Sequence, residues 1–287
     1  MLLFIDLRAS PSGGIPAAQA SLWDDGDRPV TIADFTSRVR GRDIVLATHG
    51  FNVGRASGVR ALSRWAKRIR LPGAALLMGV LWPGDSRFLP ILDYPVEGEV
   101  AIQSGRILAA FLNQNATSAA SISLVSHSLG GRMILETLDK LELEVRRLVV
   151  MAGAIEDDCL VREYQAAAEK PSEIYTLASR ADWVLEFAFP IGNPIGEIIM
   201  QGHPYFKAAL GRNGPSAPIP LAQRGGAWQI PDAWDYGHLD YMPDKDDGPS
   251  FTLPIAEPGG NDPRPIVADA GDWKPSWSAS VVATDLV

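Results

Sequence analysis

Ser128 is the residue of this chain that is best placed for nucleophilic chemistry. It lies in the run Ser-His-Ser-Leu-Gly-Gly of residues 126–131, directly after the apolar run 122–125. A serine between small residues at a strand-to-helix corner is held in a strained backbone that pushes its hydroxyl outward. The N–H of Leu129 then lies at a helix N-terminus, where negative charge is stabilised. The pattern predicts an exposed nucleophile, and an ordinary turn with an incidental serine is the alternative interpretation.

Short apolar runs and helical patterns alternate around this turn. Predicted strands cover 2–7, 44–48, 75–82, 121–126, 146–151, 173–178 and about 225–230, and predicted helices cover 55–70, 97–113, 129–140 and 158–169. Several runs are apolar throughout, as expected for strands that helices cover on both faces. The alternation predicts an α/β fold with a mostly parallel central sheet and helices on both faces. Sites in such sheets form at the carboxyl ends of the strands, so the residues after each strand matter most.

The chain resembles the α/β-hydrolase superfamily over roughly residues 40–241. Its serine turn is similar to the G-x-S-x-G nucleophile turn of that superfamily, with Ser126 in place of the first glycine. The resemblance implies that Ser128 is the nucleophile, and that an acid and then a base follow it along the chain. Asp182 and His238 each follow a predicted strand, which makes them the implied acid and base.

Other residues compete for these two roles. Asp157 and Asp158 follow an earlier strand and suit the variant that carries its acid there. His203 also comes after the acid, although it follows a helical pattern and stands beside a proline. Asp182 and His238 are preferred because of the strands that they follow.

The loop after the second predicted strand reads Thr-His-Gly-Phe-Asn at residues 48–52. It resembles the His-Gly loop of α/β-hydrolases, which implies that Phe51 aims its N–H at the substrate carbonyl and that Gly50 permits the close approach. With the N–H of Leu129, this donor would complete an oxyanion hole. A plain turn shaped by the glycine is the alternative. Together with Leu-Trp-Pro-Gly at 81–84, the loop looks most like a poorly characterised bacterial esterase-like branch.

Composition and charge fit a soluble globular protein. The 287 residues are 46% hydrophobic and 21% charged, and no apolar run approaches the ~20 residues that cross a bilayer. The N-terminal run becomes charged too early for a signal peptide. Cys159 is the only cysteine, which excludes an internal disulfide and fits a cytoplasmic protein. Without a C-x-x-C pair and with four histidines, no metal or other cofactor is expected.

Charge is distributed unevenly along the chain. Residues 28–70 hold ten Lys or Arg against two Asp, whereas residues 231–287 hold eleven Asp or Glu against three Lys or Arg. Much of the basic cluster falls on the predicted helix 55–70, opposite an apolar stripe of Val59, Leu62, Trp65, Ala66 and Ile69. A solvated helix face explains these charges, and a site for anionic lipid or nucleic acid is the alternative. Nothing aromatic is interleaved with these charges in the manner of a single-strand nucleic-acid binder, so no nucleic-acid partner is expected.

The resemblance implies hydrolysis of a small acyl ester through an acyl-enzyme. Amides or thioesters are the alternative substrates. A non-enzymatic binding protein with the same fold is the alternative function. Residues 1–242 are predicted to form the catalytic domain, and 183–224 form either ordinary packing or a cap over an acyl pocket. Residues 243–287 are an acidic Pro/Gly-rich tail without helical periodicity, for which docking and disorder are both open. The oligomeric state is not predicted. The candidate pocket residues are His49, Asn52, Trp82, His127 and Trp183.

Overall fold

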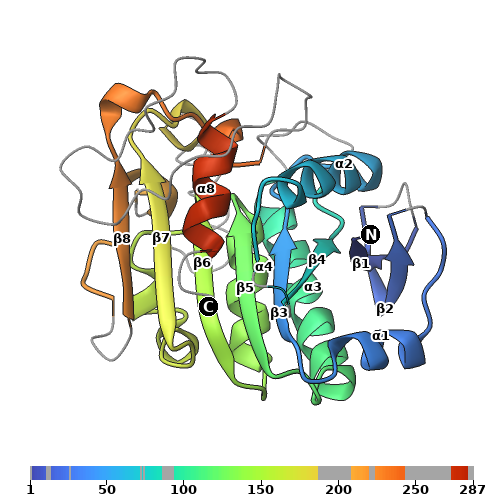
Figure 1. Ribbon diagram of the computed structural model, residues 1–287. Helices are drawn as coiled ribbons and strands as arrows, with labels where there is room; N and C mark the ends of the chain where they lie inside the picture. The colour runs from blue at the N-terminus through green and yellow to red at the C-terminus, as the bar shows by residue number, and fades with distance from the viewer. Residues whose placement is uncertain are drawn as a thin grey trace.

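The computed structural model of the chain is built around an eight-stranded sheet (Figure 1). It describes residues 2–10, 14–25, 27–71, 73, 75–85, 94–186, 208–219, 224–242 and 273–283. The strands are β1 (Leu3–Arg8), β2 (Pro16–Asp24), β3 (Asp43–Thr48), β4 (Leu76–Leu81), β5 (Ser121–His127), β6 (Val145–Met151), β7 (Glu173–Ser179) and β8 (Arg224–Ile230). Their order is β2-β1-β4-β3-β5-β6-β7-β8, and β2 alone runs antiparallel to its neighbour. The carboxyl ends of the other strands therefore meet at one edge of the sheet.

Helices cover both faces of this sheet. They are α1 (Ile32–Val39), α2 (Arg55–Ala66), α3 (Tyr94–Asn115), α4 (Gly130–Lys140), α5 (Gln165–Ala168), α7 (Leu210–Asn213) and α8 (Trp273–Ala283). In Figure 1, α8 and α2 lie on one face, whereas α3 and α4 pack against each other on the opposite face. The predicted α/β fold, with a mostly parallel central sheet and helices on both faces, is confirmed. No helix in the described part of the chain is long and apolar enough to cross a membrane.

The predicted strands are all present, and the central ones are buried on both faces. In β5 and in β6 every residue but one is fully buried, which explains why these segments are apolar throughout. The edge strand β2 and the helices α1, α7 and α8 were not predicted. The predicted helix 158–169 was wrong, because this segment forms a short 3-10 turn, Cys159–Val161, and then the single-turn α5.

Helix α2 has the predicted apolar stripe. Leu62, Trp65 and Ile69 are buried, whereas Arg60 and Lys67 are exposed on its other side. Arg64 and Arg68 are half-buried, so only part of the basic face is exposed to solvent, and the indole of Trp65 reaches the core.

Helix α8 corrects the expectation that nothing after residue 243 has helical character. Its residues from 275 to 279 are all buried, as are Val281 and Val282, so the helix is enclosed on most sides. A helix buried all round has no polar face and therefore no amphipathic period to detect in the sequence. Arg147 of β6 anchors its last turn by donating to the Val282 carbonyl at 2.9 Å. Residues 243–272 of the predicted tail lie outside the described residues.

Candidate active site

Ser128 connects β5 to α4 in a left-handed backbone conformation, with a φ of 57°. This conformation costs a non-glycine residue about 1–2 kcal/mol, so the surrounding structure must hold it in place. The N–H of Ser128 donates to the Met151 carbonyl at 3.0 Å, and its own carbonyl accepts from the N–H of Gly131 at 2.9 Å. A Cβ at Gly130 would lie only 2.5 Å from the His49 carbonyl oxygen. The strained corner that the sequence predicts is therefore present, and glycine is required beside it. The expected exposure of the serine was wrong, because Ser128 is buried, with 5% of its surface exposed.

Both ring nitrogens of His238 are hydrogen-bonded within the site. Nε2 lies 2.9 Å from Ser128 Oγ, and Nδ1 lies 2.7 Å from Asp182 Oδ2. The carboxylate of Asp182 is fully buried, and its other oxygen accepts from the N–H of Leu185 at 3.0 Å. An acceptor at Nδ1 favours the tautomer that carries its proton there and leaves Nε2 free to accept one from the hydroxyl.

The three side chains come from the ends of three strands. Ser128 follows β5, Asp182 follows β7, and His238 begins the 3-10 turn η3 (His238–Asp240) after β8. The structure thus brings together the preferred residues of the sequence analysis. Of the rival acids, Asp158 pairs with Arg162 at 3.1 Å, and Asp157 lies on the same loop after β6. The rival base His203 lies outside the described residues.

The loop after β3 passes directly beside Ser128. A Cβ on Gly50 would lie 2.7 Å from the Cβ of Ser128 and 3.2 Å from its Oγ, so only glycine leaves room for the hydroxyl. Neither the N–H of Phe51 nor that of Leu129 donates to any atom of the described residues. Two amides beside a serine hydroxyl can stabilise negative charge that develops there.

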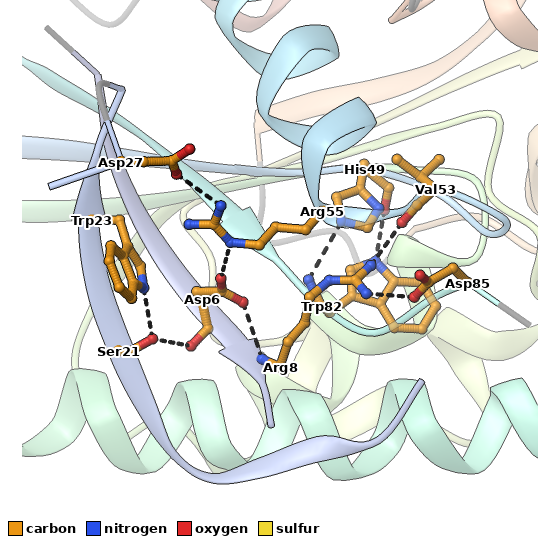
Figure 2. Close-up of polar contacts among 10 residues, drawn as sticks. All are labelled: Asp6, Arg8, Ser21, Trp23, Asp27, His49, Val53, Arg55, Trp82 and Asp85. Carbon is orange, nitrogen blue, oxygen red and sulfur yellow. Dashed lines mark hydrogen bonds and ion pairs between the residues drawn. The ribbon is translucent and has the colours of Figure 1, made fainter. Parts of the chain in front are cut away.

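Charged side chains fix this loop from the direction of β1, as Figure 2 shows. The guanidinium of Arg8 is buried; it donates to the Val53 carbonyl at 2.8 Å and pairs with Asp85. Arg55, the first residue of α2, pairs with Asp6 at 2.6 Å. Buried charges of this kind need their partners, because leaving one unpaired is far more costly than losing an exposed ion pair. The loop is therefore tied to β1 and to the segment after β4.

His49 and Trp82 form a second support for the loop. Trp82 donates from Nε1 to the His49 carbonyl at 2.9 Å, and the two rings stack with their centroids 5.9 Å apart. Nδ1 of His49 lies 2.9 Å from the Gly50 carbonyl, to which it donates. Burial lowers the pKa of His49 to about 3, so the ring is neutral. Both side chains were candidate pocket residues, and the structure places them in the packing behind the serine.

His127 joins the serine turn to the histidine loop. Its Nε2 lies 2.7 Å from the backbone carbonyl oxygen of His238, to which it donates, and the two imidazole centroids are 4.9 Å apart. Burial, followed by the nearby charge of His238, lowers the pKa of His127 to about 3. The centroid of the Tyr241 ring lies 5.9 Å from that of the His127 ring. His127, another candidate pocket residue, is therefore also a neutral and buried contact within the protein.

The remaining two candidate pocket residues are exposed. Asn52 has a φ of 56° in the loop after β3, where its N–H donates to the Gly84 carbonyl at 2.5 Å. Trp183 directly follows Asp182, and 65% of its surface is exposed. Leu239, directly after His238, is exposed to the same extent. Large apolar side chains thus adjoin both the acid and the base.

Several residues that hold the site in place were not predicted from the sequence. Arg8, Tyr241 and Lys274 each contact an element of the site, but they come from the first strand, from beyond the last strand and from α8. Only Arg8 carried a signal, since a charged residue at the carboxyl end of a buried strand points to the site edge. Within the described residues, no three His, Cys, Asp or Glu side chains form a cluster suited to a metal ion.

Comparison with known proteins gives one family match and several structural likenesses. The family described as "Alpha/beta hydrolase of unknown function (DUF900)" matches residues 28–216, a span that includes Ser128 and Asp182 and ends before His238. No curated protein matches the sequence.

Among solved structures, esterase PE8 is 16% identical over 69% of this chain and 86% of its own, with a TM-score of 0.37. Lipase B of Aspergillus fumigatus is 12% identical over 98% of this chain and 73% of its own, with a TM-score of 0.40. Esterase B of Lactobacillus rhamnosis is 11% identical over 79% of this chain and 72% of its own, with a TM-score of 0.36.

Proposed function

Because this chain belongs to the α/β-hydrolase family of unknown function, we propose that it is a serine hydrolase that cleaves carboxylic esters through an acyl-enzyme. The observation that carries the proposal is the continuous hydrogen-bonded chain from Ser128 through His238 to Asp182. Burial of the Asp182 carboxylate costs free energy unless the charge is paired or hydrogen-bonded. Its hydrogen bond to His238 can orient the imidazole for proton transfer, which a binding protein would not need.

The proposed reaction begins with attack by the serine. His238 accepts the hydroxyl proton of Ser128 at Nε2 as Oγ attacks the acyl carbon of the ester. The N–H groups of Phe51 and Leu129 hold the resulting oxyanion, and Asp182 stabilises the imidazolium. The same imidazolium then gives its proton to the leaving alcohol, which leaves an acyl group on the serine oxygen.

Water completes the cycle by the same route. His238 removes a proton from the water as its oxygen attacks the acyl-enzyme, and the serine oxygen leaves with that proton. The products are a carboxylic acid and free enzyme, and no step calls for a metal or an organic cofactor. An amide or thioester would pass through the same intermediate, so the leaving group has to be determined by experiment.

Hydrolysis of p-nitrophenyl butyrate by the wild-type protein and by Ser128→Ala tests the proposal. We expect turnover by the wild type and a fall of at least about 10³-fold in kcat for the variant. Ser123→Ala is the matched control, because Ser123 is also a buried serine and lies within β5; this variant should retain its activity. Equal activity of Ser128→Ala and the wild type would refute the proposal. A parallel panel of p-nitroanilides and thioesters identifies the preferred leaving group.

A further inference from the structure

Helix α8 is bonded to the loop that carries His238, although 30 residues separate the two described segments. Lys274 donates from Nζ to the backbone carbonyl of Asp235 and, at 2.7 Å, to Oδ2 of Asp240. In return, the hydroxyl of Tyr236 donates to the Lys274 carbonyl at 2.5 Å. One residue of α8 thus contacts the loop before and after the histidine.

These contacts act on the turn in which His238 sits. Oδ2 of Asp240, the oxygen that Lys274 binds, also accepts from the N–H of Gly237 at 2.7 Å. The N–H of Asp240 donates back to the Gly237 carbonyl at 3.1 Å, which closes a single turn with His238 as its first residue. The carboxylate of Asp240 therefore caps the turn, and the ammonium group of Lys274 orients that carboxylate.

Helix α8 is itself held firmly at its far end and along its length. Arg147, fully buried in β6, binds the Val282 carbonyl at 2.9 Å and pairs with Glu173 through Nε at 2.6 Å. The ring of Trp277 packs against that of Tyr236, with their centroids 5.6 Å apart. Because α8 is anchored to β6, its contacts can restrict the movement of the loop that carries His238.

We propose that Lys274 is a positioning residue for His238. It fixes the turn 235–241 through the Asp235 carbonyl and the Asp240 carboxylate, so that the imidazole stays within hydrogen-bond distance of both Ser128 and Asp182. The proposal rests on the proposed function for its catalytic consequence. The contacts predict that a neutral side chain at this position loosens the turn and lowers kcat, with little change in KM, because the proposed mechanism assigns neither Lys274 nor Asp240 a contact with the substrate.

The kinetic test uses Lys274→Met, Lys274→Arg and Asp240→Asn in the full-length protein. We expect Lys274→Met to lower kcat about 10- to 100-fold at unchanged KM, Asp240→Asn to have a similar effect, and Lys274→Arg to retain most of the activity. Lys170→Met is the matched control, because Lys170 also binds backbone carbonyls, those of Leu138, Asp139 and Leu141, at 2.7–3.0 Å. A fall in kcat for this control as large as for Lys274→Met would assign both effects to general destabilisation and overturn the proposal. Wild-type kcat in Lys274→Met would overturn it as well.

Hydrogen exchange gives a readout that does not depend on activity. In Lys274→Met the amide of Gly237 should exchange at least tenfold faster than in the wild type, whereas it should be unchanged in Lys170→Met. Asp240→Asn, a nearly isosteric change, provides the same test if Lys274→Met does not fold. Unchanged exchange at Gly237 would overturn the positioning role even in an inactive protein. A wild type without ester hydrolysis but with faster exchange in Lys274→Met would instead refute the proposed function alone.

Discussion

Acidification should destabilise the fold through the two buried histidines beside the site. His49 and His127 both have a pKa lowered to about 3, mainly by burial, against an ordinary value of 6.5 in the unfolded chain. Between these two values the unfolded chain binds protons that the folded protein does not bind. The free energy of unfolding therefore falls as pH decreases below about 6.5 and continues to fall toward pH 3.

The size of this effect follows from the two pKa values. From pH 7 to pH 5, each such histidine should lower the free energy of unfolding by about 2 kcal/mol. The result depends little on how far below 5 the folded pKa lies. Urea unfolding at 25 °C at the two pH values measures it, with His127→Gln as the test variant. The loss between pH 7 and pH 5 should be about 2 kcal/mol smaller in the variant, because carboxylates and the other histidines contribute equally to both proteins.

The comparison also tests the function of the His127 ring. A neutral ring that donates from Nε2 can hold the His238 carbonyl at 2.7 Å without placing a second positive charge beside the imidazolium. If His127→Gln and the wild type lost equal stability between pH 7 and pH 5, the ring of His127 would be protonated in the folded protein. That result would refute the reasoning.

Three further changes test other parts of the site. Gly50→Ala places a methyl group 2.7 Å from the Cβ of Ser128 and should lower kcat/KM for p-nitrophenyl butyrate at least about 100-fold; a change of less than threefold would contradict the tight contact. Asp182→Asn removes the acceptor of the His238 Nδ1 proton and should lower kcat about 10⁴-fold, and a variant with a tenth of wild-type kcat would exclude Asp182 as the acid. Trp183→Ala should lower kcat/KM for p-nitrophenyl octanoate about tenfold more than for the acetate, since burial of apolar surface contributes about 1.5 kcal/mol or more; equal losses for both esters would show that the substrate chain does not contact this ring.

The strands and the serine turn could be predicted from the sequence because their signals are local. A strand covered on both faces is apolar throughout, and the corner at Ser128 shows its small residues in one short run. Asp182 and His238 followed from the ends of predicted strands together with the order of acid and base that the resemblance to α/β-hydrolases implies, without any knowledge of their distance from the serine. The edge strand β2 escaped detection because only Leu22 and Asp24 of its nine residues are fully buried, so it has no apolar run.

The supports of the site could not be predicted, because they depend on contacts between distant parts of the chain. Lys274 lies 34 residues beyond Asp240, and Arg8 lies 45 residues before Val53. Neither pairing leaves a periodic signal. Trp82 could be placed near the site, but only the structure shows its ring stacked on His49 behind the loop. Local pattern thus identifies the reacting groups, whereas long-range packing determines what positions them.

The most direct test of the central claim is the site at which a fluorophosphonate probe reacts. Serine hydrolases form a covalent phosphonyl-serine with such a probe only when the hydroxyl is activated by its base. Mass spectrometry of the wild type should show one adduct, on the peptide that contains Ser128, and His238→Gln should form it at least about 10³-fold more slowly. Labelling of Ser123→Ala at the wild-type rate completes the expected pattern. A wild-type protein without an adduct, or with its adduct on another residue, would contradict the account.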